Sequence, residues 1–184
     1  MTVRLATLAD IPALRVLIKD SVRTLGARQY DAQQIESSLR YLFGVDTTLI
    51  DDETYFVTEE DEELVGCGGW SKRQTPFGGD HAEAQNTAFR NPATDPAVIR
   101  AFFVHPDHAR RGIGRMLLHA SEQAALDAGF RQIDLVATLS GQPFYETNGY
   151  RAVEPVPITL PDGVFIQATR MVRTTHPTAA DATS

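Results

Sequence analysis

The segment that most constrains the fold is an apolar run that leads through a glycine-containing turn into an amphipathic helix. The run Ile99–Val104 is interrupted only by Arg100, as expected for a central strand covered on both faces. The turn contains Gly112 and Gly114, and apolar residues then recur at helical spacing up to Ala124. This order of strand, tight turn and helix predicts an α/β protein.

The same turn carries a signal for anion binding. A buried strand brings the chain to a helix N-terminus, where unpaired N–H groups attract an anion and glycines allow it close to the backbone. Arg110, Arg111 and Arg115 add positive charge there, although the net charge of the chain is -7. The turn therefore predicts a pyrophosphate site.

Other phosphate motifs fit the turn poorly. After Gly112 and Gly114 there is no third glycine where a dinucleotide-binding fingerprint requires one, and no Lys-Ser or Lys-Thr pair completes a P-loop. The plain structural alternative is a glycine-containing helix start with surface arginines.

The rest of the chain predicts a strand and helix order that surrounds this segment. We expect a single domain over residues 1–173 and a disordered polar tail over residues 174–184. Expected strands are 2–6, 55–58, 64–72 and 133–138; expected helices are 11–25, 31–42, 111–129 and 140–147; residues 73–96 form a long loop, and 151–160 and 164–173 form a terminal hairpin.

Composition limits the class of partner. A net charge of -7 disfavours nucleic acid, because phosphate backbones need a positive surface. No stretch approaches the ~20 apolar residues that span a bilayer, and the N-terminus has no apolar signal region, so we expect a cytoplasmic protein without a membrane partner. The single cysteine, Cys67, excludes an intrachain disulfide and a cysteine-rich metal site. A homodimer through the terminal hairpin is a further expectation.

Two separated motifs resemble one known family. They are Val104-His105-Pro106 followed by Arg111-Gly112-Ile113-Gly114-Arg115-Met116-Leu117-Leu118, and Phe144-Tyr145-Glu146 with Gly149-Tyr150. In this order they look like the GNAT superfamily of acyl-CoA-dependent N-acetyltransferases. The resemblance implies an α/β fold (α+β by some schemes) with a mixed, mostly antiparallel central sheet, splayed near its centre, and helices on both faces.

The resemblance also implies acetyl-CoA as co-substrate, without a metal. The turn would hold the CoA pyrophosphate through backbone amides, and the strand before it would lie along the pantetheine arm. Tyr145 would protonate the leaving thiolate. The residues implied for the cofactor are Phe102, Phe103, Val104, Ala109, Arg110, Arg111, Gly112, Ile113, Gly114 and Arg115.

Two positions depart from the family pattern. Ala109 stands where the family usually has Gln or Arg, so that a side-chain contact with the phosphates is lost or moves to Arg110. Thr138 stands where an Asn is often found, with Ser140 nearby, so that this CoA contact is missing or remade.

The general base is not marked clearly. Val98 occupies the place where some family members carry a glutamate. Asp80, His81 and Glu83 in the long loop are alternatives, and histidine has a suitable unperturbed pKa. A chain of water molecules would serve equally well.

The acceptor site has four candidate residues, each with a plain alternative. Trp70 would wall the pocket or lie in the core, and Tyr30 would contact the acceptor or simply open a helix. Asp80 and His81 would be binding residues or ordinary loop residues. Cys67 is set aside as a nucleophile, since a strand cysteine is usually a small buried hydrophobe.

These expectations combine into one function and one rival. We expect an N-acetyltransferase that transfers an acetyl group to a primary amine, of a small molecule, by direct attack in a ternary complex. The rival is a non-catalytic acyl-CoA-binding sensor or interaction module, which the unmarked base favours. The identity of the acceptor amine stays open.

Overall fold

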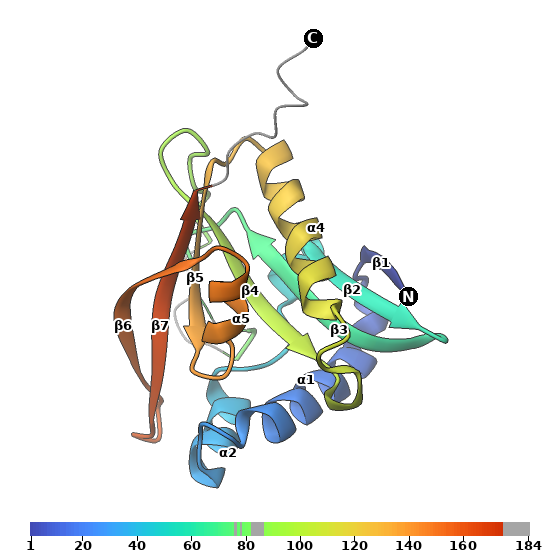
Figure 1. Ribbon diagram of the computed structural model, residues 1–184, viewed down its shortest axis with the longest axis vertical. Coiled ribbons are helices and arrows are strands. Elements are labelled where there is room, and N and C mark those ends of the chain that lie inside the picture. The colour runs from blue at the N-terminus through green and yellow to red at the C-terminus, as the bar shows by residue number, and fades with distance from the viewer. Residues whose placement is uncertain (76, 78, 82–86, 175–184) are drawn as a thin grey trace.

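The computed structural model describes residues 1–75, 77, 79–81 and 87–174. Within them the strands form a seven-stranded sheet in the order β1-β2-β3-β4-β5-β7-β6 (Figure 1). The strands are β1 (Thr2–Leu5), β2 (Tyr55–Glu60), β3 (Glu63–Ser71), β4 (Ala97–Val104), β5 (Gln132–Thr138), β6 (Arg151–Thr159) and β7 (Phe165–Thr174).

Helices cover both faces of this sheet. α1 (Ile11–Gly26) and α2 (Ala32–Tyr41) lie on one face, and α4 (Ile113–Asp127) and α5 (Gln142–Thr147) lie on the other (Figure 1). The short helices are α3 (Thr47–Asp51), η1 (Leu8–Asp10) and η2 (Pro106–His108). No described helix combines the length and the apolar character that crossing a bilayer requires.

Local sequence accounts for the main helices. α1 buries Leu14, Ile18 and Val22 at helical spacing against the sheet. α2 begins with a capping box, in which Asp31 accepts from the Gln34 backbone and Gln34 accepts from the Asp31 backbone. The element order and the sheet confirm the expected layers, strands and terminal hairpin.

Several boundaries differ from the sequence-based expectation. The helix after the turn begins at Ile113 and not at Arg111, because Gly112, the residue just before it, has left-handed backbone angles. β4 begins at Ala97, two residues early, and α3 was not expected at all. Glu83 and the expected tail after Thr174 lie outside the described residues.

The sheet opens between β4 and β5. These two strands are parallel and pair only through Ala97, Val98 and Ile99, whereas every other neighbouring pair of strands is antiparallel. Beyond Ile99, no strand of the described residues pairs with β4 on its β5 side. The mixed, mostly antiparallel sheet with a splayed centre is confirmed.

A β-bulge lies at the point where β4 leaves β5. Cys67 pairs with Phe103 and Gly69 with Arg100, so that two β4 residues, Ala101 and Phe102, lie opposite one β3 residue. Ala101 adopts a φ of +60°. The glycine between Cys67 and Gly69 is needed here, because a Cβ on it would lie 2.6 Å from the Phe102 ring.

A buried ion pair fixes the strand just before the bulge. The Arg100 guanidinium lies 2.7 Å from the Asp46 carboxylate, with side chains that are 3% and 0% exposed. Arg100 also donates to the Thr75 carbonyl, and Asp46 accepts from the Leu49 amide at the start of α3. Burial raises the pKa of the Asp46 carboxyl from 3.8 to about 6, although the charge of Arg100 opposes the shift. Burial also lowers the pKa of Arg100.

These pKa shifts predict a pH-dependent stability that Asp46→Asn removes. A pKa raised in the folded state means that the stabilisation is complete below the unfolded pKa and is lost as the pH rises through the folded one. Relative to Asp46→Asn, the wild type should therefore lose up to about 3 kcal/mol of unfolding free energy between pH 4 and pH 7. Urea unfolding at both pH values measures this difference.

Asp31→Asn is the matched control, since Asp31 caps α2 in an exposed position. A difference that stays constant, or that grows in favour of the wild type, would show that Arg100 holds Asp46 ionised throughout.

Candidate active site

The turn between β4 and α4 contains two residues in the left-handed conformation. Arg110 has a φ of +67° and Gly112 a φ of +86°, a region that glycine adopts at little cost. A Cβ on Gly112 would meet no heavy atom within 4 Å, so this part of the turn faces open space. Such backbone turns bring successive N–H groups to one side, and the first-turn N–H groups of α4 follow directly. The geometry fits a diphosphate.

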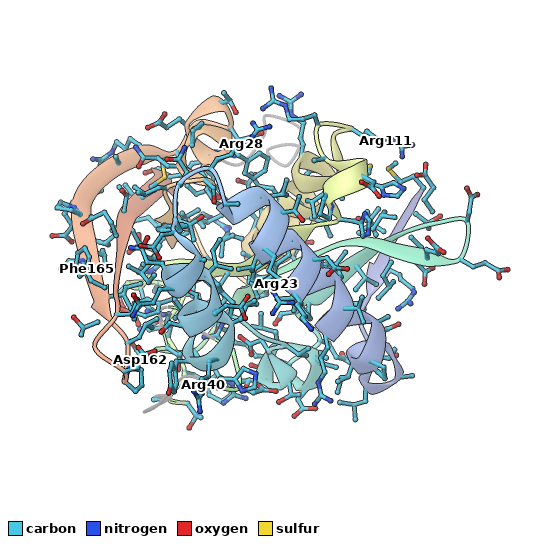
Figure 2. All side chains as sticks on the ribbon, turned by 90° about the horizontal axis from the view of Figure 1, so that it is seen from below. Arg23, Arg28, Arg40, Arg111, Asp162 and Phe165 are labelled. Carbon is cyan, nitrogen blue, oxygen red and sulfur yellow. The ribbon has the colours of Figure 1, made fainter. Side chains whose placement is uncertain are left out.

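The three arginines of this turn have different partners. Arg111 lies at the start of α4, beside the β2–β3 hairpin, and donates two 2.8 Å hydrogen bonds to Glu60 (Figure 2). Arg115 makes one long contact of 3.4 Å with Asn148. Among the described residues, nothing bonds the Arg110 guanidinium. Arg110 is therefore the arginine of the turn that is available to a phosphate.

The open edge of β4 runs from this turn towards the bulge. The Val104 amide donates to the Ser21 hydroxyl of α1 at 3.3 Å, so that this amide is already engaged. Phe102 turns its ring towards α5 and meets the Tyr145 ring edge-on, with centroids 6.3 Å apart. The edge thus connects the turn to the residue expected to act as the acid.

Tyr145 is held in an aromatic environment. Its ring makes edge contacts with Phe144 and Tyr150 as well as with Phe102, and the residue is 7% exposed. α5 docks directly on α4, where the Phe144 ring lies 3.2 Å from the position of a Cβ on Gly114. No group in the described part of the chain bonds the Tyr145 hydroxyl, and burial raises the Tyr145 pKa well above its usual range. The phenol therefore stays protonated.

Tyr30 connects the segment between α1 and α2 to the β5 side of the splay. Its hydroxyl donates to the Gln167 carbonyl of β7 at 2.7 Å and accepts from the Leu139 amide at 2.9 Å. The segment between α1 and α2 is thereby tied to the second half of the sheet.

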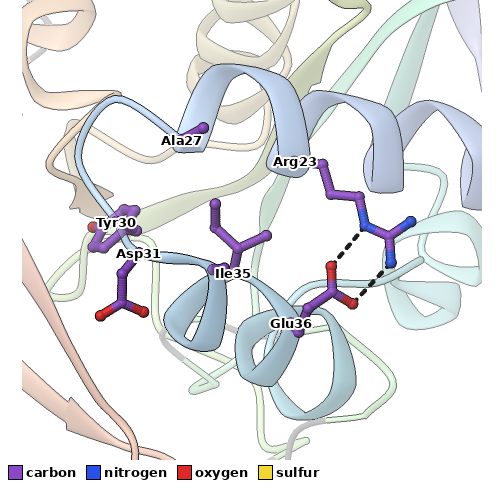
Figure 3. A pocket seen from close by; sticks show the side chains of 7 residues that line it. Arg23, Ala27, Tyr30, Asp31, Ile35 and Glu36 are labelled. Carbon is purple, nitrogen blue, oxygen red and sulfur yellow. Dashed lines mark hydrogen bonds and ion pairs between the residues drawn. The ribbon is translucent and has the colours of Figure 1, made fainter.

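A hollow of about 410 Å³ lies beside Tyr30, between α1 and α2 (Figure 3). The ion pair of Arg23 with Glu36 borders it, with an N–O distance of 2.8 Å. The other lining residues are Ala27, Asp31, Ala32 and Ile35.

The remaining candidates lie elsewhere. Trp70 is 4% exposed and packs edge-on against Phe130, within a cluster that includes α4 residues, which favours the core alternative. Asp80 accepts from the Thr47 amide and hydroxyl at the start of α3. The ring of His81 packs over Gly44, next to α3. Burial raises the pKa of the Cys67 thiol to about 12, which disfavours a nucleophilic role.

Two groups at the turn have no clear signal in the sequence. Glu60 lies in an acidic run, and His108 follows the strand, yet the His108 ring lies 3.3 Å from the Glu60 carboxylate. Thr138, where the family often has Asn, accepts from the Gly141 amide at 3.1 Å and so helps to begin α5. The Glu60–His108 contact joins residues far apart in the sequence and has no periodic signal.

Comparison with protein families gives one match. The model of the acetyltransferase (GNAT) family matches residues 19–150, well over half of the 184 residues. No curated protein matches the chain.

Solved structures share the fold at low sequence identity. A GCN5-related N-acetyltransferase of Rhodopseudomonas palustris has a TM-score of 0.69 at 18% identity, covering 94% of each chain. The PaiA N-acetyltransferase of Thermoplasma acidophilum, in complex with coenzyme A, has a TM-score of 0.63 at 16% identity, covering 94% of this chain and 98% of that one. YncA of Salmonella typhimurium, a putative acetyltransferase with its cofactor acetyl-CoA, has a TM-score of 0.63 at 17% identity, covering 97% and 96%.

The family match spans the second half of α1, the open edge of β4, the turn and Tyr145, which are the parts that the geometry brings together. The chain belongs to the GNAT family and is an acetyltransferase.

Proposed function

We propose that the protein transfers an acetyl group from acetyl-CoA to a primary amine of a small molecule, by direct attack in a ternary complex. The observation that carries this proposal is the unpaired edge of β4, which leads from the left-handed turn at Gly112 to the buried Tyr145. The structural relatives PaiA and YncA, solved with coenzyme A and acetyl-CoA, support the choice of co-substrate.

Different groups of the chain would bind different parts of acetyl-CoA. The backbone amides of residues 110–115 would hold the diphosphate, since the Ala109 amide already donates to the Pro106 carbonyl at 3.1 Å, and the Arg110 side chain would supply the charge that Ala109 cannot. Phe102, Phe103 and the open β4 edge would lie along the pantetheine arm. Backbone N–H groups of β4 beside the bulge would stabilise the developing oxyanion.

Tyr145 would donate its proton to the sulfur as the thiolate leaves. The unperturbed pKa of a thiol is about 8.5, and exclusion of water raises the pKa of the leaving thiol further. A neutral phenol can therefore protonate the thiolate. Because burial keeps the Tyr145 pKa high, the acid form persists across the physiological range.

The acceptor would enter from the side of α1 and α2. Tyr30 and the hollow beside it are the best placed of the expected acceptor groups. Asp80 is engaged at the start of α3, which leaves His81, Glu83 or a water chain to accept the proton of the amine. We extend the proposal to a cytoplasmic enzyme without nucleic-acid or membrane partners. It would dimerise through β6, where Val153 is 44% exposed.

Gly112→Glu should weaken coenzyme A binding about 100-fold or more, because a carboxylate would enter the space meant for the diphosphate. Isothermal titration with coenzyme A measures the loss. Gly163→Glu is the control: Gly163 also has a positive φ, +82°, and open space around it, but lies in the terminal hairpin. Equal losses in both variants would argue against the turn as the diphosphate site.

Tyr145→Phe should lower kcat about 100-fold while changing the coenzyme A Kd less than twofold, because the proton is needed only as the thiolate forms. The kcat of the wild type should show no alkaline decline caused by Tyr145 below about pH 10. Tyr150→Phe is the matched control, since the Tyr150 hydroxyl is bonded to Glu122. Unchanged turnover in Tyr145→Phe would exclude the acid role.

A panel of amines tests the function as a whole. We expect free thiol to appear from acetyl-CoA in an acceptor-dependent manner with at least one small primary amine. Tight coenzyme A binding without turnover on any amine, including peptide N-termini, would instead support the binding module.

A further inference from the structure

The turn proposed to bind the diphosphate has a backbone conformation that local preference alone does not stabilise. Arg110 is not a glycine and yet has a φ of +67°, two residues before Gly112 at +86°. A residue with a Cβ stays in this region only where surrounding contacts impose it. The contacts on either side of Arg110 therefore decide whether the turn is ready for a ligand.

One carboxylate holds both sides of Arg110. Glu60 accepts two parallel 2.8 Å hydrogen bonds from Arg111, with one oxygen bonded to each terminal nitrogen. The same side chain lies 3.3 Å from Nε2 of His108. A bidentate carboxylate–guanidinium pair restricts both distance and orientation, which a single contact does not. Residues 108 and 111 are thus fixed to the same point.

The Glu60 carboxylate belongs to a rigid part of the sheet. Glu60 is the last residue of β2, is directly paired with Glu63 of β3, and is only 21% exposed. α4 packs on both strands, so that the hairpin and the helix start move together. In the sheet order β3 and β5 lie on opposite sides of β4, so Arg111 is drawn to the side away from the splay.

We propose that Glu60 is a positioning residue for coenzyme A: by holding Arg111 and His108, it presets the left-handed turn whose amides receive the diphosphate. Arg111 then acts through Glu60 and not through its own contact with phosphate. This inference rests on the proposed function, because it requires the turn to be the diphosphate site.

A double-mutant cycle with Glu60→Gln and Arg111→Gln tests the proposal. Each single variant should raise the coenzyme A Kd about tenfold, measured by isothermal titration, because either one removes the bidentate pair. The double variant should bind about as weakly as either single one. In steady-state assays the KM for acetyl-CoA should rise with Kd, whereas kcat and the KM for the amine should stay within twofold.

Glu63→Gln is the matched control. It removes the same charge from the residue directly opposite Glu60, without touching the turn. It should leave the coenzyme A Kd unchanged, and thermal unfolding of all variants should lie within a few degrees of the wild type, because the pair is still reached by solvent, with the Arg111 side chain 46% exposed, and such pairs contribute little to stability.

Three results would overturn the proposal. One is a Glu60→Gln variant that binds coenzyme A as well as the wild type, or more tightly because Arg111 is released towards the phosphate. Another is a double variant whose loss is the product of the two single losses, which would mean independent roles. The third is an equal loss in Glu63→Gln, which would mean a general charge effect. If the wild type itself fails to bind coenzyme A, the proposed function falls together with this inference.

Discussion

Strand β4 is an interior strand whose pairing with β5 ends halfway along its length, and the arrangement of the site depends on this open edge. It pairs with β5 over Ala97, Val98 and Ile99 and then diverges, while its pairing with β3 continues. Main-chain groups inside a protein need partners, so an interior strand with one open edge favours a ligand that can supply them. The chain continues from the open edge of β4 into the turn and α4. One continuous segment therefore offers both the strand edge and the helix N-terminus to a ligand.

Two acidic residues hold this segment at its irregular points. Asp46 meets Arg100 just before the bulge, in a buried position, and Glu60 meets Arg111 just after the left-handed residue of the turn. In both cases the partner comes from a distant part of the chain. The backbone angles at Ala101 and Arg110 are thus imposed by tertiary contacts and not by local preference.

The sequence was sufficient for whatever depends on local pattern. Periodicity predicted the main helices and strands, and the family resemblance carried by the glycine turn and the Tyr145 motif implied which elements would form the site. It was insufficient where distant residues decide. Within β4 no glycine or proline marks the bulge at Ala101, five residues are too few for α3 to show a period, and Glu60 could not be told from its solvated neighbours in the acidic run. Trp70 was ambiguous because both faces of β3 are buried.

The bulge also changes the register of side chains along β4. Before it, strict alternation would send Ala101 to the α4 face, yet Ala101 packs with the α1 cluster, Phe102 turns to α4, and Phe103 returns to α1. The number of residues in this strand is therefore fixed as firmly as their identity. A strand one residue shorter here would alternate strictly and would lose the bulge at which β4 leaves β5, so lineages of this protein should tolerate insertions and deletions in the long loop before β4 more readily than within β4.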